Sequence, residues 1–327
     1  MRLARARTPT RVSTTVEGST IVIRMTTADP RPALDRLAAD TAMGPVTLLV
    51  GDLDLQLRYY RDVLGLQVVE RPDERIEGVG RPDVVVLGRG TQPLVVLRHT
   101  PDLPPTSRGQ AGLFHTAILF DTQEALAATL ASVAARAPRT YVGSADHLVS
   151  EAFYLTDPEG NGVELYWDRS RDLWGYDEHG RVLMDSLRLD PNAFIQGHVT
   201  DAALAAPAGK PVVGHVHLQV GDVAGARAFY VDALGFDVMA EWHGALFVSA
   251  GGYHHHMAMN TWNSAGAGPR ASSLGLGEVT LVVPGTDDVG ALRERLASHG
   301  VPVRDDGATV TFDDPWRNVV RVRPAAA

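Results

Sequence analysis

Residues 44–66, "GPVTLLVGDLDLQLRYYRDVLGL", and residues 214–236, "GHVHLQVGDVAGARAFYVDALGF", align without a gap and decide the fold. Each begins as a short alternating strand, continues into a helical pattern and closes on a Leu-Gly pair. Asp52 and Asp222 stand where a helix N-cap belongs, and Gly65 and Gly235 stand where a C′ glycine belongs. The chain therefore contains an internal repeat.

Two weaker copies of the repeat complete the pattern. Residues 114–120, "FHTAILF", and residues 277–283, "GEVTLVV", each precede a helical stretch and short strands. These two copies end in similar turn-then-strand segments, "DPEGNGVEL" and "DPWRNVVRV". Each copy reads as strand, helix and about three strands, so the sequence predicts an α+β fold of four βαβββ modules. We number the modules one to four in chain order.

The repeats set the expected boundaries. We expect residues 1–40 to be a disordered extension, with Met25 as an alternative start, since the Arg-rich opening lacks the apolar core of a secretory signal. Modules one and two occupy residues 41–168, and modules three and four occupy residues 213–325. Residues 169–212 between them end in the low-complexity "TDAALAAPAGKP" and read as a linker.

Composition excludes several classes of protein. The net charge of −9 argues against a nucleic-acid partner held through phosphate contacts. The chain has no cysteine, which excludes disulfides, thiolate metal sites and a cysteine nucleophile, and suits a cytoplasmic location. No apolar run approaches the roughly 20 residues of a membrane span, so we expect no membrane contact.

Four modules with these motifs resemble the vicinal oxygen chelate superfamily, which includes glyoxalases, bleomycin resistance proteins and extradiol dioxygenases. The chain is most similar to its two-domain, catechol-2,3-dioxygenase-like group, over about residues 42–325. The most specific stretches are 146–169, 214–223 and "GGYHHHMAMNTW" at 251–262. The resemblance implies that modules pair into two domains with curved mixed sheets, and that a pair encloses a metal-centred cavity.

In this family the metal ligands come from the first and last strands of a module. The first-strand position falls on Pro45, His115, His215 and Glu278 in modules one, two, three and four, and the last-strand position on Val96, Glu164, Ala258 and Arg321. The resemblance therefore implies a metal site of His115, Glu164 and His215. His217 competes with His215, because strand alternation puts both side chains on one face.

Two imidazoles and one carboxylate form the facial triad that suits Fe(II) in oxygenases, with Mn(II) or another divalent ion as alternatives. The three residues come from modules two and three, whereas the family usually places the triad in its last two modules. We therefore expect modules two and three to assemble the site and modules one and four to form its structural counterpart. If the modules instead pair in sequential order, His215 lies in the other domain and the triad is incomplete. Taken singly, each ligand also reads as a buried core histidine or a solvated strand residue.

The "YHHH" run at 253–256 lies just before the Ala258 position. Strand alternation predicts that His254 and His256 share the face of Ala258, with His255 facing away. His256 is then a candidate acid or base, and Tyr253, His254 and His217 are candidate substrate contacts. An inert polar strand edge is the alternative.

The resemblance implies two further polar residues beside the metal. In extradiol enzymes of the superfamily, a Tyr three residues before the Asp-Pro turn lines the active site, as Tyr154 does relative to Asp157. A His lies upstream of the last strands, and His147 is the candidate here, although its offset matches the family less closely. Packing of Tyr154 at the rim is the alternative reading.

The sequence therefore predicts an Fe(II)-dependent extradiol dioxygenase of aromatic catabolism, which acts on a catechol-like substrate with O₂. A glyoxalase or isomerase-type lyase on the same fold is the first alternative, and a metal-free ligand-binding or resistance protein is the second. The Ala258 position favours the dioxygenase, because glyoxalases and epimerases of this family usually carry a fourth protein ligand there. Paired modules of this kind also suit a homo-oligomer.

Overall fold

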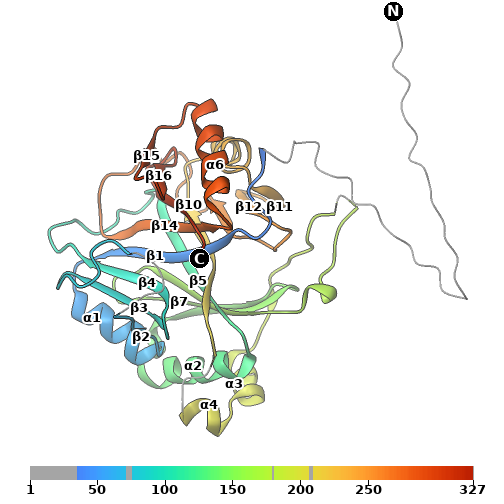
Figure 1. Ribbon diagram of the computed structural model, residues 1–327. Helices are drawn as coiled ribbons and strands as arrows, with labels where there is room; N and C mark the ends of the chain where they lie inside the picture. The colour runs from blue at the N-terminus through green and yellow to red at the C-terminus, as the bar shows by residue number, and fades with distance from the viewer. Residues whose placement is uncertain (1–34, 71–75, 179, 206–208, 327) are drawn as a thin grey trace, which may run out of the picture. The chain divides into compact units, whose positions relative to one another are not determined.

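The computed structural model describes residues 35–70, 76–178, 180–205 and 209–326. Most of the predicted disordered extension, residues 1–34, lies outside this part of the chain, as do residues 206–208 of the predicted linker. Each repeat forms a strand, a helix and three further strands, so the predicted α+β fold of four βαβββ modules is confirmed (Figure 1). None of the described helices combines the length and the apolarity needed to cross a bilayer.

Modules one and four share one sheet. In the described residues its eight strands follow the order β15-β16-β17-β14-β1-β4-β3-β2, with β1 antiparallel to β14 and parallel to β4. Their bounds are β1 (Ala42–Val50), β2 (Gln67–Val68), β3 (Val84–Arg89), β4 (Gln92–His99), β14 (Gly275–Val283), β15 (Val303–Asp305), β16 (Val310–Asp313) and β17 (Val319–Pro324).

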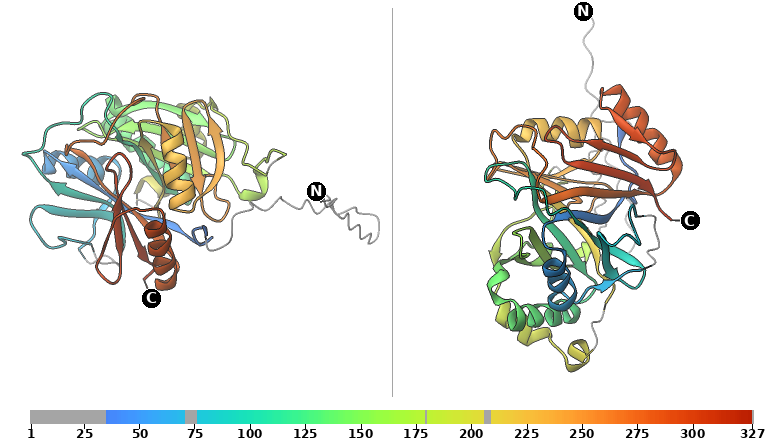
Figure 2. Two further views of the ribbon diagram at one scale, coloured as in Figure 1. Left: turned by 90° about the horizontal axis from the view of Figure 1, so that it is seen from above. Right: turned by 90° about the vertical axis from the view of Figure 1, so that its left-hand side faces the viewer.

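Modules two and three share the other sheet, which has the order β11-β12-β13-β10-β5-β8-β7-β6-β9. The strand order thus has the expected pairing of two with three and one with four, and Figure 2 shows the two sheets. The bounds are β5 (Gly112–Phe120), β6 (Tyr141–Asp146), β7 (Ser150–Thr156), β8 (Gly162–Asp168), β9 (Leu187–Arg188), β10 (Val212–Gln219), β11 (Asp237–Trp242), β12 (Ala245–Ser249) and β13 (Met257–Asn260).

The helices bury their apolar faces against these sheets. In α2 the side chains of Leu126 and Leu130 are buried, and in α6 those of Leu292 and Leu296 are buried, all in one core that spans both sheets. The helical bounds are α1 (Leu53–Arg58), η2 (Tyr59–Val63), α2 (Gln123–Arg136), η3 (Pro138–Thr140), η4 (Arg171–Leu173), α3 (Pro191–His198), α4 (Asp201–Ala205), α5 (Val223–Arg227), η5 (Ala228–Ala233) and α6 (Thr286–Ser298).

The local signals of the two strong repeats have the expected roles. Asp52 accepts a hydrogen bond from the Leu55 N–H and so caps α1, and Asp222 accepts one from the Gly225 N–H and caps α5. Gly65 has φ 74° and Gly235 has φ 95°, a backbone conformation that residues with a Cβ rarely adopt.

Buried tyrosine–aspartate pairs join modules that follow one another in the chain but lie in different sheets. The Tyr60 hydroxyl of module one donates to Asp157 Oδ2 of module two at 3.2 Å. The Tyr230 hydroxyl of module three donates to Asp314 Oδ2 of module four at 2.9 Å. The Asp-Pro turns found by sequence comparison therefore fasten one sheet to the other.

Candidate metal centre

Three adjacent strands bring His115, Glu164 and His215 together. β5 lies between β10 and β8, and its Ala117 pairs with Glu164 on one side and with His215 on the other. His115 precedes Ala117 by two residues and therefore projects from the same face of the sheet. Glu164 Oε2 lies 3.0 Å from His115 Nε2 and 3.2 Å from His215 Nε2. All three side chains are buried, and one ligand atom from each lies within 4.8 Å of the others.

The chemistry of this donor set fits a divalent cation. Two ligand atoms about 2.1 Å from one ion and at right angles to each other are about 3.0 Å apart, close to the separations seen here. His115 Nε2 is buried and has no hydrogen-bond partner among the described residues, although it lies 3.0 Å from Glu164 Oε2. A cation held by His115, Glu164 and His215 would satisfy this nitrogen.

Electrostatics favour the protonation states that bind metal. Burial lowers the pKa of His215 to about 4, against a weaker opposing effect of Glu164, so its ring is neutral at neutral pH. Burial alone would raise the pKa of the Glu164 carboxyl, but the adjacent imidazoles hold that pKa well below its usual range. Neutral imidazole and ionised carboxylate are the forms that donate electron pairs to an ion.

A cavity of about 500 Å³ opens above His115 and Glu164. Its volume lies in the range typical of small-molecule sites. Its wall is mostly apolar and aromatic, which suits a flat, apolar ligand placed against the candidate metal. The aromatic and aliphatic side chains of the wall include Leu113, Phe114, Val163, Trp242, Phe247 and Trp262.

His147 and Tyr154 lie in this cavity as a hydrogen-bonded pair. Tyr154 is the strand partner of Glu164, and its hydroxyl lies 2.6 Å from His147 Nε2. His147 Nδ1 lies 2.7 Å from the carbonyl oxygen of Asp185, which only accepts, so Nδ1 carries the hydrogen. In a neutral His147 ring, Nε2 then accepts from the Tyr154 hydroxyl. Burial raises the pKa of Tyr154 well above its usual value, which keeps this hydroxyl protonated.

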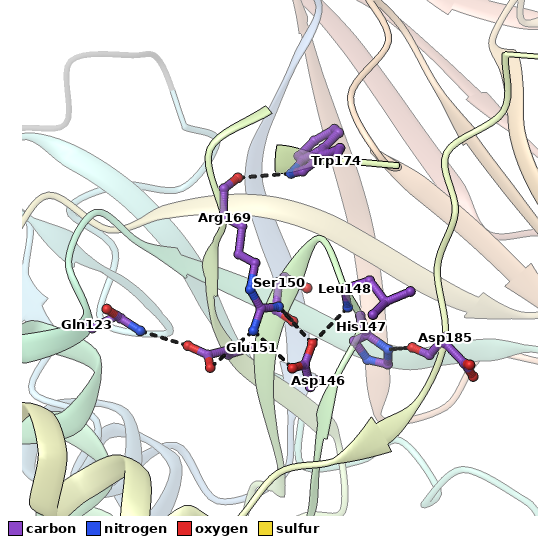
Figure 3. Close-up of polar contacts among 9 residues, drawn as sticks. All are labelled: Gln123, Asp146, His147, Leu148, Ser150, Glu151, Arg169, Trp174 and Asp185. Atoms are coloured by element: carbon purple, nitrogen blue, oxygen red, sulfur yellow. Dashed lines mark hydrogen bonds and ion pairs between the residues drawn. The ribbon is translucent and has the colours of Figure 1, made fainter. Parts of the chain in front are cut away.

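An ion-pair network fixes the hairpin that carries His147. Figure 3 shows Arg169 reaching Asp146 with both terminal nitrogens, at 2.7 and 2.9 Å. Asp146 Oδ1 also accepts the N–H of Leu148, a non-glycine residue with φ 70° at the hairpin turn. His147 is thus held between this network and the Asp185 carbonyl. No pattern in the sequence pointed to Arg169, since its role depends on a fold that returns β8 beside this turn.

The prediction for the triple histidine was wrong in its alternation. His254 and His255 line the cavity, whereas His256 does not. The reason is local: β13 begins only at Met257, and the residues before it form a turn in which Gly251 and Gly252 have φ 62° and 69°. The two-residue period of a strand therefore does not extend back to these histidines.

The His255 ring packs on the His215 ring, with centroids 4.0 Å apart, and covers it on the cavity side. A hydrogen-bonded chain lies behind His255: its Nδ1 is 2.8 Å from His254 Nδ1, and His254 Nε2 is 3.0 Å from Asp168 Oδ1. Since the carboxylate accepts from His254, a neutral His254 accepts from His255 through Nδ1. The Nε2 atom of a neutral His255 then carries no hydrogen.

Tyr253 and His217 were both predicted to contact the substrate, and only His217 lines the cavity. Tyr253 does not line the cavity, and its hydroxyl bonds to the Tyr166 hydroxyl and to Asp168 at 2.7 Å each. The structure therefore does not place it as a substrate contact. His217 does line the cavity, and its Nε2 lies 2.9 Å from the Asn260 amide nitrogen, which leaves it engaged away from Glu164.

His256 has a structural environment that predicts a pH effect. Its Nδ1 accepts from the Ala250 N–H at 3.2 Å, and burial lowers its pKa to about 3. Because the unfolded ring has a pKa near 6.5, stability is lost as the pH falls below that value. We expect His256→Asn, which keeps an acceptor for Ala250, to remove about 1.4 kcal/mol of the loss between about pH 7.5 and 5.5. Urea unfolding of both proteins at the two pH values measures this difference, and equal losses would contradict it.

Comparisons with known proteins agree with this fold. The model of one family, described as the Glyoxalase/Bleomycin resistance protein/Dioxygenase superfamily, matches residues 42–165 and 212–322. A catechol-2,3-dioxygenase of Bacillus subtilis (strain 168) is 34% identical over 282 residues, which cover 84% of this chain and 94% of that protein.

Solved structures show the same fold at low sequence identity. Glyoxalase I from Zea mays superposes with a TM-score of 0.52 at 15% identity, covering 87% of this chain and 92% of that one. The CppA protein from Streptococcus pneumoniae TIGR4 has a TM-score of 0.52 at 12% identity, covering 89% of this chain and 100% of that one.

Proposed function

The chain belongs to the glyoxalase/bleomycin resistance protein/dioxygenase superfamily and is a metal-dependent dioxygenase, and we propose that it opens the ring of a catechol-like aromatic in the extradiol manner. One observation carries the proposal. The donor atoms of His115, Glu164 and His215 lie within 4.8 Å of one another, and His115 and Glu164 line a largely apolar cavity. The B. subtilis relative, named for a reaction on catechol, supports the same substrate class.

We propose Fe(II) as the ion, held by these three residues, with Mn(II) as the alternative. The chemistry that Fe(II) supplies at a two-histidine, one-carboxylate site is electron transfer between an aromatic diol and O₂ bound together. Ala258, which is fully buried beside His217, occupies the position where a fourth protein ligand would stand. A methyl group supplies no fourth ligand there, which favours oxygen chemistry over a glyoxalase or isomerase reaction.

The polar residues of the cavity have distinct proposed roles. The His147 and Tyr154 pair exchanges a proton with the substrate, because the Tyr154 hydroxyl bonds to an imidazole that accepts its hydrogen. His255 takes the role first assigned to His256, as a base, since it lines the cavity and His256 does not. Phe114 and Trp262, with ring centroids 5.6 Å apart, form an apolar wall for the aromatic ring.

Tyr154→Phe tests the proton-handling role. The variant keeps the ring and removes the hydroxyl, so we expect kcat to fall by about 100-fold while bound metal stays unchanged. Steady-state oxygen uptake and metal analysis measure the two quantities. Tyr141→Phe is the matched control, since the Tyr141 hydroxyl bonds to Ser144 and Tyr141 is exposed. Loss of metal from Tyr154→Phe, or equal kcat in the two variants, would contradict the role.

The function itself is tested with anaerobically Fe(II)-loaded protein. We expect oxygen consumption with one or more members of a catechol panel, and a ring-opened product from the same reaction. Turnover of a hemithioacetal without oxygen uptake would instead support the glyoxalase or isomerase alternative. Protein that binds an aromatic ligand but retains no metal would support the non-enzymatic alternative. We also propose that the protein is cytoplasmic and that it forms a homo-oligomer.

A further inference from the structure

The sheet formed by modules one and four has a cavity of its own, of about 300 Å³. It lies on β1, β4, β14 and β17, the strands that correspond to β10, β13, β5 and β8 around the candidate metal centre. The charged side chains of its lining are Glu77, Arg98, Glu278, Arg321 and Arg323. We call it the counterpart cavity.

The strand registers locate the charge change between the two cavities. Thr280 pairs with Arg321 across β14 and β17, as Ala117 pairs with Glu164 across β5 and β8. Arg321 therefore occupies the position of the metal-binding carboxylate. The same place in the fold carries a negative charge in one sheet and a positive charge in the other.

A second arginine is placed by the same comparison. Leu49 pairs with Arg98 across β1 and β4, as Gln219 pairs with Asn260 across β10 and β13. Arg98 thus replaces a buried amide that bonds to His217 in the candidate metal centre. Both arginines line the counterpart cavity.

Arg321 is only loosely paired. Its Nη1 lies 4.0 Å from Glu278 Oε1 and its Nη2 lies 3.7 Å from Asp306 Oδ2, both beyond hydrogen-bond distance. Its Nη2 donates to the Thr309 hydroxyl at 3.3 Å. A planar guanidinium is well matched to two oxygens of one anion, which these long contacts do not provide.

Arg98 has a donor without an acceptor. Its Nε is buried and has no hydrogen-bond partner among the described residues, and its Nη2 makes one long bond, 3.5 Å, to the carbonyl of Glu77. A buried N–H group without an acceptor is costly. Arg98 is thus weakly paired among the described residues, and an oxyanion in the cavity would give its terminal nitrogens an acceptor.

We propose that the counterpart cavity binds a small oxyanion, a carboxylate or a phosphate, through Arg98 and Arg321. The lining carries three arginines and two glutamates, so an anion enters a site with a net positive charge. Burial raises the pKa of Glu278, against the opposing effect of Arg321. The fold thus has a cation site in one sheet and an anion site in the other.

Isothermal titration calorimetry of the metal-loaded, full-length protein tests the proposal at constant ionic strength. Inorganic phosphate, acetate and benzoate are titrated separately. We expect saturable binding of at least one anion with Kd at or below about 1 mM, and about tenfold to 100-fold weaker binding in Arg98→Gln and in Arg321→Gln. Preference for benzoate over acetate identifies a carboxylate with an apolar body, and preference for phosphate identifies a phosphate.

Three further variants distinguish binding in the counterpart cavity from a general charge effect, a folding defect and an effect of the metal centre. Arg293→Gln, which removes a half-exposed guanidinium paired with Asp305 outside the cavity, is expected to bind like the parent protein. Arg321→Lys keeps the charge and should lose less affinity than Arg321→Gln, which separates anion binding from a folding defect. Glu164→Gln, which weakens the metal centre, should leave anion binding unchanged. Failure of the proposed dioxygenase function can therefore be distinguished from failure of the anion-binding proposal.

Absence of saturable binding by the parent protein would overturn the proposal. Equal affinity in the parent, Arg98→Gln and Arg321→Gln proteins would do so too.

Discussion

Replacing His215 with alanine is expected to lower the affinity for the catalytic metal by at least about 100-fold and to abolish oxygen uptake with it. Loss of residues that only support metal ligands already costs about 10-fold to 100-fold. His215 does more, since its Nε2 lies 3.2 Å from Glu164 Oε2 among the three convergent donor atoms. Metal analysis after dialysis against a weak chelator measures the affinity, and oxygen uptake at saturating Fe(II) measures activity.

His217→Ala is the matched control for this experiment. His217 lies two residues further along β10, is buried like His215 and lines the cavity, but its Nε2 is engaged by Asn260. We therefore expect this variant to retain its metal. Retention by His215→Ala together with loss from His217→Ala would show that the two histidines have been assigned the wrong way round.

Gly214→Ala is expected to destabilise the protein by about 3 kcal/mol, at the upper end of the cost of overpacking a core. A Cβ on this residue would lie 1.7 Å from the hydroxyl oxygen of Tyr166, a fully buried side chain. That hydroxyl bonds to Tyr253, so displacing it disturbs the chain that runs through Asp168 to His254. Urea unfolding measures the change in the free energy of unfolding.

A double variant identifies the clash as the cause. Tyr166→Phe removes the oxygen nearest to the added Cβ, so Gly214→Ala should cost at least about 1 kcal/mol less in that background. Gly290→Ala in α6 is the control, since its added Cβ meets no described atom within 4 Å apart from those of its chain neighbours and of the backbone of its own helix. We expect that change to be neutral or stabilising by up to about 1 kcal/mol. Equal costs of Gly214→Ala in the two backgrounds would exclude the clash.

The repeat in the sequence predicted the modules because it consists of local signals, the helix caps and the Leu-Gly pairs. The capping aspartates and the two Leu-Gly pairs act within a few residues, so their positions define α1 and α5 without knowledge of the tertiary fold. The pairing of modules is not local, yet the distribution of possible ligands predicted it. Pro45 and Arg321 exclude a metal site in modules one and four, and the strand order agrees.

The candidate site was predictable where a regular strand carries it. His115, Glu164 and His215 lie inside β5, β8 and β10, where alternation holds. The histidines before Met257 were misplaced because a glycine turn replaces the strand there. The partners Asp168 and Arg169 were missed because what they contact depends on how β8 packs beside distant segments.

Each sheet combines a module from the first half of the chain with one from the second half, and this arrangement affects how the polypeptide folds as it is synthesised. Among the described strands β1 is the first to leave the ribosome, and its antiparallel neighbour β14 belongs to the last module, with Ala42 opposite Val282. Contacts between residues this far apart in sequence form late, and they reduce the rate of folding. A nascent chain that ends before β10 exposes the edges of both β1 and β5, which invite misassociation. We therefore expect that neither half of the chain folds on its own. A chimera that takes one half from a relative would have to preserve both the β1–β14 and the β5–β10 pairings.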